Sequence, residues 1–226
     1  MKHNNLINSL KIAFAVLTVM SFSACEKNTI DPSGSFNLKV VNAAQDVPAQ
    51  SFTIAGEKII SGGLGFTDAS AYIPYSSGKR LVCEFKNESN DILSAKGELW
   101  TADGANFTAY LAGQGSSLRV KFFEDDLSVP NGGKVKVKFI HLSDAAPSDL
   151  AVKSNGENLV NNLSRNTESS YKYVNPGNLS ITVVGNAQGR TIGTFDLTGL
   201  VAGKIYTLYL TGSTDATIKL NKVLHN

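Results

Sequence analysis

The feature that most constrains the fold of this chain is an internal repeat with a spacing of about 99 residues. Alternating apolar positions near residue 36 recur near residue 135, and the motif YLAG at residues 110–113 recurs as YLTG at residues 209–212. The matches keep their order along the chain with only single-residue gaps, so we interpret residues 36–226 as two tandem copies of one unit. The matched pairs include Phe36, Leu38 and Val40 with Val135, Val137 and Phe139, Pro48 with Pro147, and Tyr72 with Tyr171.

Within each copy the hydrophobic pattern is that of short β-strands. Residues 134–139, with the sequence KVKVKF, alternate polar and apolar side chains, and residues 118–122 and 179–183 do the same. Turn-forming residues interrupt the chain about every 8 to 12 positions, which is typical of a β-sandwich. Alternation allows one buried face per strand, so the matched apolar positions are expected to point inward in both copies.

A segment in the second copy indicates which type of β-sandwich the chain forms. In residues 200–206, LVAGKIY, Tyr206 has the spacing of a tyrosine corner, in which a tyrosine at the start of a late strand hydrogen-bonds to upstream backbone. The first copy has Phe107 there, which cannot form the bond. The sequence therefore predicts an all-β fold of two tandem Ig-like antiparallel β-sandwich domains. They span residues 36–125 and 134–226, and residues 126–133 link them.

The first 24 residues have the pattern of a secretory signal peptide. Lys2 and Lys11 form a basic start before an apolar run at residues 12–20. The run is shorter than the roughly 20 apolar residues that a membrane-spanning helix needs. The motif SAC at residues 23–25 resembles a bacterial lipobox, in which the sulfur of Cys25 would receive a diacylglyceryl group before cleavage. An ordinary signal peptide with a chance cysteine is the alternative.

Lipidation at Cys25 predicts a protein anchored in the outer membrane of a gram-negative bacterium. The membrane partner would be bound through acyl chains, which gain about 0.8 kcal/mol per buried methylene. Residues 25–35 are polar and would form a tether that reaches roughly 20 Å as a flexible coil. The sequence leaves open whether the folded part faces the periplasm or the cell surface.

Charge and cysteine content exclude several classes of protein. Removal of residues 1–24 takes away two lysines and leaves 19 basic and 19 acidic side chains, so nucleic acid is not expected as a partner. Two cysteines are too few for a disulfide-stapled miniprotein or a multi-cysteine zinc cluster. If Cys25 is lipidated, Cys83 has no disulfide partner, and its place on the apolar face of residues 81–85 predicts a buried, inert thiol.

Residues 139–149 are the one run with chemically versatile side chains, since His141, two serines and two aspartates lie close together. A catalytic triad or metal site would need further partners that converge in space. The only other histidine after the signal peptide is His225, near the end of the sequence, which we expect to be frayed. Because the first copy makes the equivalent turn with Asn42, we predict a structural role for His141 in the turn, and no catalytic residue, metal or cofactor.

The turn FIHLSDAAP at residues 139–147, its copy VVNAAQDVP at residues 40–48 and the tandem arrangement resemble the family called domain of unknown function 4397. The resemblance covers most of residues 36–226 and implies repeated Ig-like units in a secreted or lipid-anchored bacterial protein. This sequence departs from the H-x-S-P-D-A-P run that is usual in the family, because Asp144 stands in place of proline and Ala145 in place of aspartate. The resemblance carries over no catalytic residues.

Two further features bear on ligands. Lys134, Lys136 and Lys138 share one strand face, and we expect solvated lysines that protect an edge strand rather than contacts for an anionic ligand. Aromatic residues near the loops would suit a sugar platform if exposed, but they fit the inside of a sandwich equally well. These aromatic residues are Trp100, Tyr72, Tyr75, Tyr171 and Tyr173.

The leading functional hypothesis is a non-enzymatic envelope lipoprotein whose domains serve as a binding, adhesion or structural module for an unknown protein or glycan ligand. The alternative is an accessory lipoprotein that captures a glycan or peptide for an outer-membrane uptake system, which requires an exposed aromatic patch. A hydrolase is the third hypothesis, which requires histidine or carboxylate groups that converge in a cleft.

Overall fold

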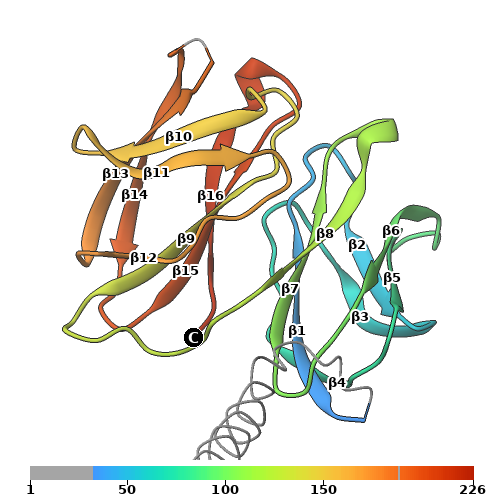
Figure 1. Ribbon diagram of the computed structural model, residues 1–226. Helices are drawn as coiled ribbons and strands as arrows, with labels where there is room; N and C mark the ends of the chain where they lie inside the picture. The colour runs from blue at the N-terminus through green and yellow to red at the C-terminus, as the bar shows by residue number, and fades with distance from the viewer. Residues whose placement is uncertain (1–32, 188) are drawn as a thin grey trace, which may run out of the picture.

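The structure of the protein is a computed structural model that describes residues 33–187 and 189–226. Over these residues the chain forms sixteen β-strands and two short 3-10 helices, Gly115–Ser117 and Asp215–Thr217, arranged as two sandwiches side by side (Figure 1). The predicted signal peptide, Cys25 and most of the tether lie outside the described residues. Within the described ranges, no helix is long and apolar enough to cross a membrane.

The first sandwich is built from β1 (Ser35–Asn42), β2 (Gln50–Ile54), β3 (Glu57–Leu64), β4 (Ile73–Ser76), β5 (Leu81–Asn87), β6 (Leu93–Leu99), β7 (Asn106–Ala112) and β8 (Arg119–Glu124). Its two sheets have the strand orders β4-β1-β7-β8 and β3-β2-β5-β6. Phe36, Leu38 and Val40 of β1 are buried in the core between these sheets. There the rings of Phe52 and Phe85 pack edge to face, with centroids 4.8 Å apart.

The second sandwich is built from β9 (Val135–His141), β10 (Asp149–Ser154), β11 (Glu157–Ser164), β12 (Lys172–Val174), β13 (Gly177–Gly185), β14 (Thr191–Leu200), β15 (Ile205–Thr211) and β16 (Lys219–Leu224). Its sheets, β12-β9-β15-β16 and β11-β10-β13-β14, repeat the order of the first. Val135, Val137 and Phe139 lie in its core. The predicted all-β fold of two sandwich domains and the inward orientation of the matched residues are confirmed.

The strand order differs from the predicted Ig-like arrangement. β1 lies between β4 and β7 and pairs with β7 in parallel, and β9 and β15 form the same parallel pair, so the sheets are not wholly antiparallel. An immunoglobulin constant domain has strands A, B, E and D in one sheet and C, F and G in the other. The parallel pairs arise because β1 and β7 are separated by an even number of chain reversals. The term Ig-like therefore describes the two-sheet architecture and not the strand order.

Two local predictions about buried side chains are confirmed. The backbone N–H of Val201 donates a 3.3 Å hydrogen bond to the Tyr206 hydroxyl at the start of β15, which forms the tyrosine corner. Phe107 takes the equivalent place in β7 and packs edge to face on Phe36. Cys83 of β5 is fully buried, and burial raises the pKa of its thiol to about 12. Such a thiol stays protonated at neutral pH and is a poor nucleophile.

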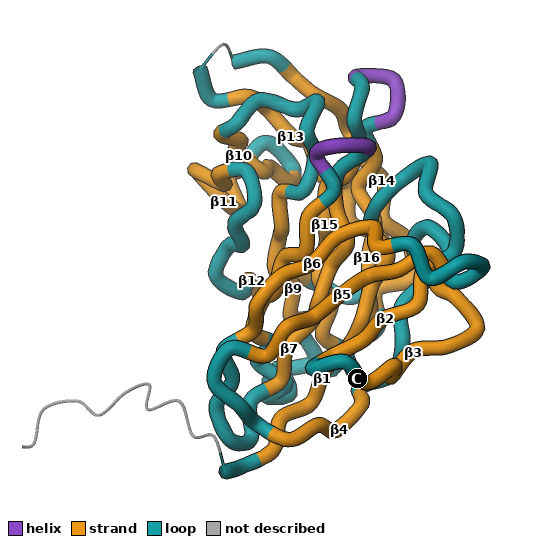
Figure 2. Tube along the Cα trace, turned by 90° about the vertical axis from the view of Figure 1, so that its right-hand side faces the viewer, coloured by secondary structure: helices purple, strands orange, loops and turns teal. Residues whose placement is uncertain are grey.

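A further apolar core joins the two sandwiches, between the sheets β4-β1-β7-β8 and β12-β9-β15-β16. Figure 2 is a side view in which the sheet β3-β2-β5-β6 is the outermost layer. β9 and β15 are buried over their whole length, and β1 and β7 over most of it, because neighbouring sheets cover both of their faces. Alternation had predicted only one buried face per strand. The residues of this inter-repeat core are Val41, Ala43, Tyr110, Ala112 and Phe123 with Ile140, Leu142, Tyr209 and Val223.

The tyrosine corner leads to a testable stability difference. Tyr206→Phe removes the hydroxyl that accepts the Val201 N–H, and it should lower the free energy of unfolding by about 1 kcal/mol. Tyr209→Phe is the matched control, because the buried Tyr209 hydroxyl has no hydrogen-bond partner among the described residues. Urea unfolding followed by circular dichroism measures both variants. Equal losses from the two substitutions would show that the corner bond contributes nothing.

Candidate functional site

Ionisable side chains converge at the junction between the two sandwiches. Lys138 Nζ on β9 lies 3.0 Å from Asp125 Oδ1 and 2.8 Å from Glu168 Oε2. The Lys138 and Asp125 side chains are 1% and 0% exposed. Burial by itself lowers the pKa of Lys138, but the charges of Asp125, Tyr171 and Glu168 outweigh it and raise the pKa overall. Lys138 therefore stays charged, and the pair connects residues of both sandwiches in a site that solvent screens little.

A chain of hydrogen bonds continues from Asp125 into the second sandwich. The Tyr72 hydroxyl donates to Asp125 Oδ2 at 2.9 Å and lies 2.7 Å from His225 Nδ1, while His225 Nε2 lies 2.8 Å from the Thr207 hydroxyl. Because Tyr72 gives its proton to Asp125, Nδ1 of His225 donates to Tyr72 and Nε2 accepts from Thr207. Burial lowers the pKa of His225 to about 4, against the opposing effect of Asp125, so the ring is neutral at pH 7.

The junction has an internal twofold relation, because equivalent positions of the two copies meet each other. Asp125 and His225 each follow the last strand of their sandwich, and Asp125 Oδ1 lies 3.7 Å from His225 Nε2. Thr108 and Thr207 are equivalent residues of β7 and β15, and they hydrogen-bond to Asp125 and His225 at 2.5 and 2.8 Å. Two equivalent aromatic rings, with centroids 5.4 Å apart, are those of Tyr110 and Tyr209.

Contacts away from the twofold axis occur in reciprocal pairs. The Ser117 hydroxyl of the first copy donates to Asp144 Oδ2 of the second at 3.0 Å. At the equivalent positions, the Gln45 side-chain amide donates to the Thr217 carbonyl, also at 3.0 Å. Such reciprocity defines an isologous interface, the type found in twofold-symmetric homodimers. The chain thus contains an interface of dimer type within one polypeptide.

The expectation that the lysines of β9 are solvated was wrong for two of them. β9 lies between β12 and β15, so it is not an edge strand, and the first sandwich covers the face that would be solvated in a lone domain. Lys136 and Lys138 are each 1% exposed. Lys136 Nζ lies 2.6 Å from Asp126 Oδ2, and this contact lowers the pKa of Asp126 to about 2. Lys134, which precedes the strand, is exposed as expected.

His141 is fully buried and contributes to the turn that follows β9. Its Nε2–H donates to the Pro147 carbonyl at 2.8 Å, and its Nδ1 is buried with no partner among the described residues. Burial lowers the pKa of His141 to about 4. In the first copy the Asn42 amide instead donates to the Leu64 carbonyl at 2.9 Å. The predicted structural role of His141 in the turn is confirmed.

His225 is not frayed, contrary to expectation. β16 pairs with β15 as far as Leu224, and the backbone N–H of His225 donates to the Ile205 carbonyl at 2.9 Å. Across the described part of the chain, no group of three or more His, Cys, Asp or Glu residues could hold a metal ion. The converging side chains at the junction already bind one another. We name this cluster the inter-repeat lock, formed by Tyr72, Asp125, Lys138, Glu168 and His225.

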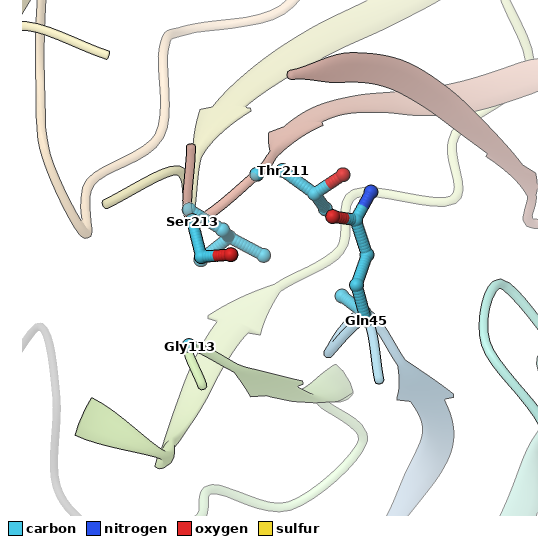
Figure 3. A pocket seen from close by; sticks show the side chains of 7 residues that line it. Gln45, Gly113, Thr211 and Ser213 are labelled. Atoms are coloured by element: carbon cyan, nitrogen blue, oxygen red, sulfur yellow. The ribbon is translucent and has the colours of Figure 1, made fainter. Parts of the chain in front are cut away.

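A small cavity also lies at the junction, where Gln45 of the first copy reaches toward Thr211 and Ser213 of the second (Figure 3). Its volume is about 10 Å³, which is room for about one water molecule. Gln45 Oε1 is buried with no hydrogen-bond partner among the described residues. The cavity therefore suits a single bridging water and not a larger ligand.

A groove of about 420 Å³ lies at the open edge of the first sandwich, where the edge strands β6 and β8 approach each other. Trp100 stands at this groove with 52% of its surface exposed. Asn166, which also lines the groove, comes from the second copy, so both copies contribute. We name it the Trp100 groove, with apolar walls from Trp100, Phe107 and Phe122 and polar groups from Glu98, Lys121 and Asn166.

Two neighbouring residues give the Trp100 groove its shape. Gly97 allows β6 and β8 to approach closely, because a Cβ atom at this position would lie only 3.0 Å from the Phe122 ring. Arg119 donates from Nε to Asn166 Oδ1 at 2.7 Å and forms an ion pair with Asp144 at 3.0 Å. Asn166 adopts a φ of 66°, which asparagine tolerates better than most residues. Contacts between the copies therefore hold Asn166 in the groove.

The aromatic residues named from the sequence are divided between the junction and the surface. Tyr72 and Tyr171 lie at the junction, each with a lysine ammonium over its ring, at 4.7 and 4.5 Å from the centroid. Tyr75 donates to a backbone carbonyl within the first sandwich. Trp100 and Tyr173 are exposed, at 52% and 61%, and each lines a groove. No local signal in the sequence placed Trp100 and Asn166 of the second copy in one groove, because packing of the copies brings them together.

The buried histidines lead to a prediction for acid stability. His141 and His225 have pKa values of about 4 in the folded protein, below the usual 6.5 of an unfolded chain. The unfolded state takes up protons first as the pH falls, so stability is lost between about pH 6.5 and pH 4. His141→Asn, which installs the residue of the first copy, should reduce the loss measured between pH 7.5 and pH 5 by urea unfolding. An unchanged loss of stability in this variant would contradict the lowered pKa of His141 as a cause.

Two solved structures align with the chain at low TM-scores. The C-terminal domain of AlgF from P. aeruginosa is 20% identical, with a TM-score of 0.27, over 42% of this chain and 98% of that domain. CBMbc, of family CBM26, from Eubacterium rectale Amy13K in complex with maltoheptaose is 13% identical, with a TM-score of 0.28, over 84% of this chain and 97% of that chain. At these TM-scores neither likeness carries an argument about fold or ligand.

Comparison at the level of families is more informative. No curated protein matches the sequence. The family described as domain of unknown function (DUF4397) matches residues 36–151, which cover the first sandwich, the linker and the first strand and turn of the second. The matched range includes both copies of the turn at residues 40–48 and 139–147 and spans just over half of the chain. The chain therefore belongs to the DUF4397 family.

Proposed function

We propose that this protein is a lipid-anchored envelope protein that acts as a non-enzymatic binding module and captures a glycan in the Trp100 groove. The observation that carries the proposal is the combination of a half-exposed indole with a small set of polar groups in one groove. Sugar rings present apolar C–H faces and a rim of hydroxyl groups. An aromatic platform beside carboxylate, ammonium and amide groups is complementary to both.

The chemistry of Glu98 favours binding over hydrolysis. Among the described residues, Glu98 is the one carboxylate that lines the Trp100 groove, whereas most glycoside hydrolases use two carboxyl groups. Arg80 Nε lies 2.9 Å from Glu98 Oε2, and this hydrogen bond lowers the pKa of Glu98. A general acid needs a raised pKa. Glu98 therefore suits a hydrogen-bond acceptor for sugar hydroxyls.

Anchorage is the second part of the proposal and rests on the sequence. The lipobox-like residues 23–25 support lipidation of Cys25, and the polar residues after it support a tether to the outer membrane. β1 begins at Ser35, so the folded part starts where the predicted tether ends. A tether of roughly 20 Å would let the first sandwich meet a polymer near the membrane surface.

The glycan proposal predicts the effect of removing the indole. Trp100→Ala should weaken binding by about tenfold or more, because an aromatic anchor at a binding hot spot typically contributes about 2 kcal/mol or more and tenfold is about 1.4 kcal/mol. Val201→Ala is the matched control, since Val201 is 53% exposed and lies in the corresponding loop of the second copy. Affinity electrophoresis against soluble xylan, β-glucan, mannan, pectin and glycogen measures the effect. Retarded migration that survives Trp100→Ala would place the ligand elsewhere.

Anchorage is tested by removing the thiol of Cys25. Cys25→Ser should abolish lipidation, because a serine hydroxyl is a poor substitute for a thiol in diacylglyceryl transfer. The wild type should stay with membranes in high salt and leave only with detergent, since burial of acyl chains is insensitive to charge screening. Cys83→Ala is the control that removes the other thiol. If the Cys25→Ser protein partitioned into detergent as fully as wild type, the lipoprotein assignment would be wrong.

A further inference from the structure

The second sandwich has a groove of its own, separate from the Trp100 groove. It measures about 360 Å³ and lies between the β10–β11 turn, β12 and the start of β13. Tyr173 of β12 stands at this groove and is 61% exposed. Leu159, Val174 and Leu179 supply apolar surface. The polar groups around Tyr173 are those of Lys134, Asn155, Glu157, Asn175 and Asn178.

This Tyr173 groove is held in place by contacts that exist without a ligand. Tyr173 pairs with Lys136 in the β12–β9 ladder, and its neighbour Val174 is anchored in the core of the second sandwich. Lys134 Nζ donates to Asn175 Oδ1 at 2.7 Å, which leaves the Asn175 NH₂ group available as a donor. A fixed aromatic ring with amide donors beside it resembles the Trp100 groove in chemistry, although the two use different strands.

Comparison of the two copies shows that neither Trp100 nor Tyr173 belongs to the set of residues that both copies share. In the strand registers, Tyr173 corresponds to Pro74 of the first copy, and Asn175 corresponds to Ser76. The first sandwich therefore forms without an aromatic residue at this position. Conversely, residues 198–205 of the second copy, which replace the segment around Trp100, contain no aromatic residue. Each copy has one exposed aromatic residue that the other copy lacks and that the fold does not require.

We propose that the Tyr173 groove is a second glycan subsite and that the natural ligand is a polysaccharide long enough to occupy both grooves. This inference rests on the proposed function of the Trp100 groove. The inter-repeat lock joins the two sandwiches, so for a polymer that reaches both grooves, binding at the second would be intramolecular once the first is filled. A short oligosaccharide would fill the grooves independently, whereas a polymer would gain avidity.

The test uses the full mature chain in detergent and one polysaccharide from the set above that the wild type binds, with its hexasaccharide fragment. Titration calorimetry with the hexasaccharide should give two sites per chain in the wild type. Tyr173→Ala and Trp100→Ala should each leave one site, and the double variant none. Affinity for the polymer should fall about tenfold or more in either single variant, because avidity is lost. Val129→Ala, at an exposed linker residue outside both grooves, is the control.

The outcomes of this experiment distinguish failure of the second subsite from failure of the proposed function on which it rests. One hexasaccharide site that Trp100→Ala abolishes and Tyr173→Ala leaves intact would refute the second subsite and retain the Trp100 groove. Absence of binding to every polysaccharide of the set would refute the proposed function and the inference with it. Tyr173→Phe should keep two sites if the ring itself is the platform, and its circular dichroism and urea unfolding should match those of the wild type.

Discussion

The buried ion pair between Lys138 and Asp125 joins the two sandwiches at their junction, beside the apolar inter-repeat core. Removing one partner of such a pair typically costs about 3–5 kcal/mol, because the other is left charged in a site without water. The Trp100 groove is built from the same segments of the chain as this ion pair and its partner Glu168. β8, which ends just before Asp125, carries Lys121 and Phe122 of the groove, and the loop that carries Glu168 also carries Asn166. The lock and the groove therefore share two segments of the chain.

A duplicated chain can place unlike residues where a homodimer would place like ones. At the twofold axis of this interface, an exact repeat would bring two aspartates or two histidines together. Two buried carboxylates at close range repel each other, and one of them must take up a proton. Divergence to Asp125 in one copy and His225 in the other replaces that repulsion with hydrogen bonds through Tyr72. Two unlike copies in one chain thus permit an interface that is symmetric in shape and complementary in hydrogen bonding.

Local sequence patterns predicted those features of the fold that depend on residues of a single sandwich. The alternation around Leu38 and Val137, the spacing of Tyr206 and the apolar neighbours of Cys83 all depend on residues close in sequence or within the same core. The burial of Lys136 depends on the linker residues Asp126 and Ser128, and the contacts of the His225 ring depend on Tyr72 and Asp125 of the first copy. No local pattern reports such contacts. One signal in the sequence does indicate a covered strand. β15 reads IYTLYLT, with apolar or aromatic residues on both faces, which is typical of a strand that is covered on both sides.

The two copies also act as an internal comparison that separates structure from function. Positions that correspond and resemble each other, such as Thr108 and Thr207 or Tyr110 and Tyr209, lie in the junction, where packing explains them. Trp100 and Tyr173 have no aromatic counterpart, and neither is required for a sandwich to form. Exposing aromatic surface to water is unfavourable by roughly 25 cal/mol per Å² of apolar area, and more than half of each residue is exposed here, 52% of Trp100 and 61% of Tyr173. A ligand that covered these rings would remove this apolar area from water, so the differences between the copies, rather than their similarities, support the proposed binding surface.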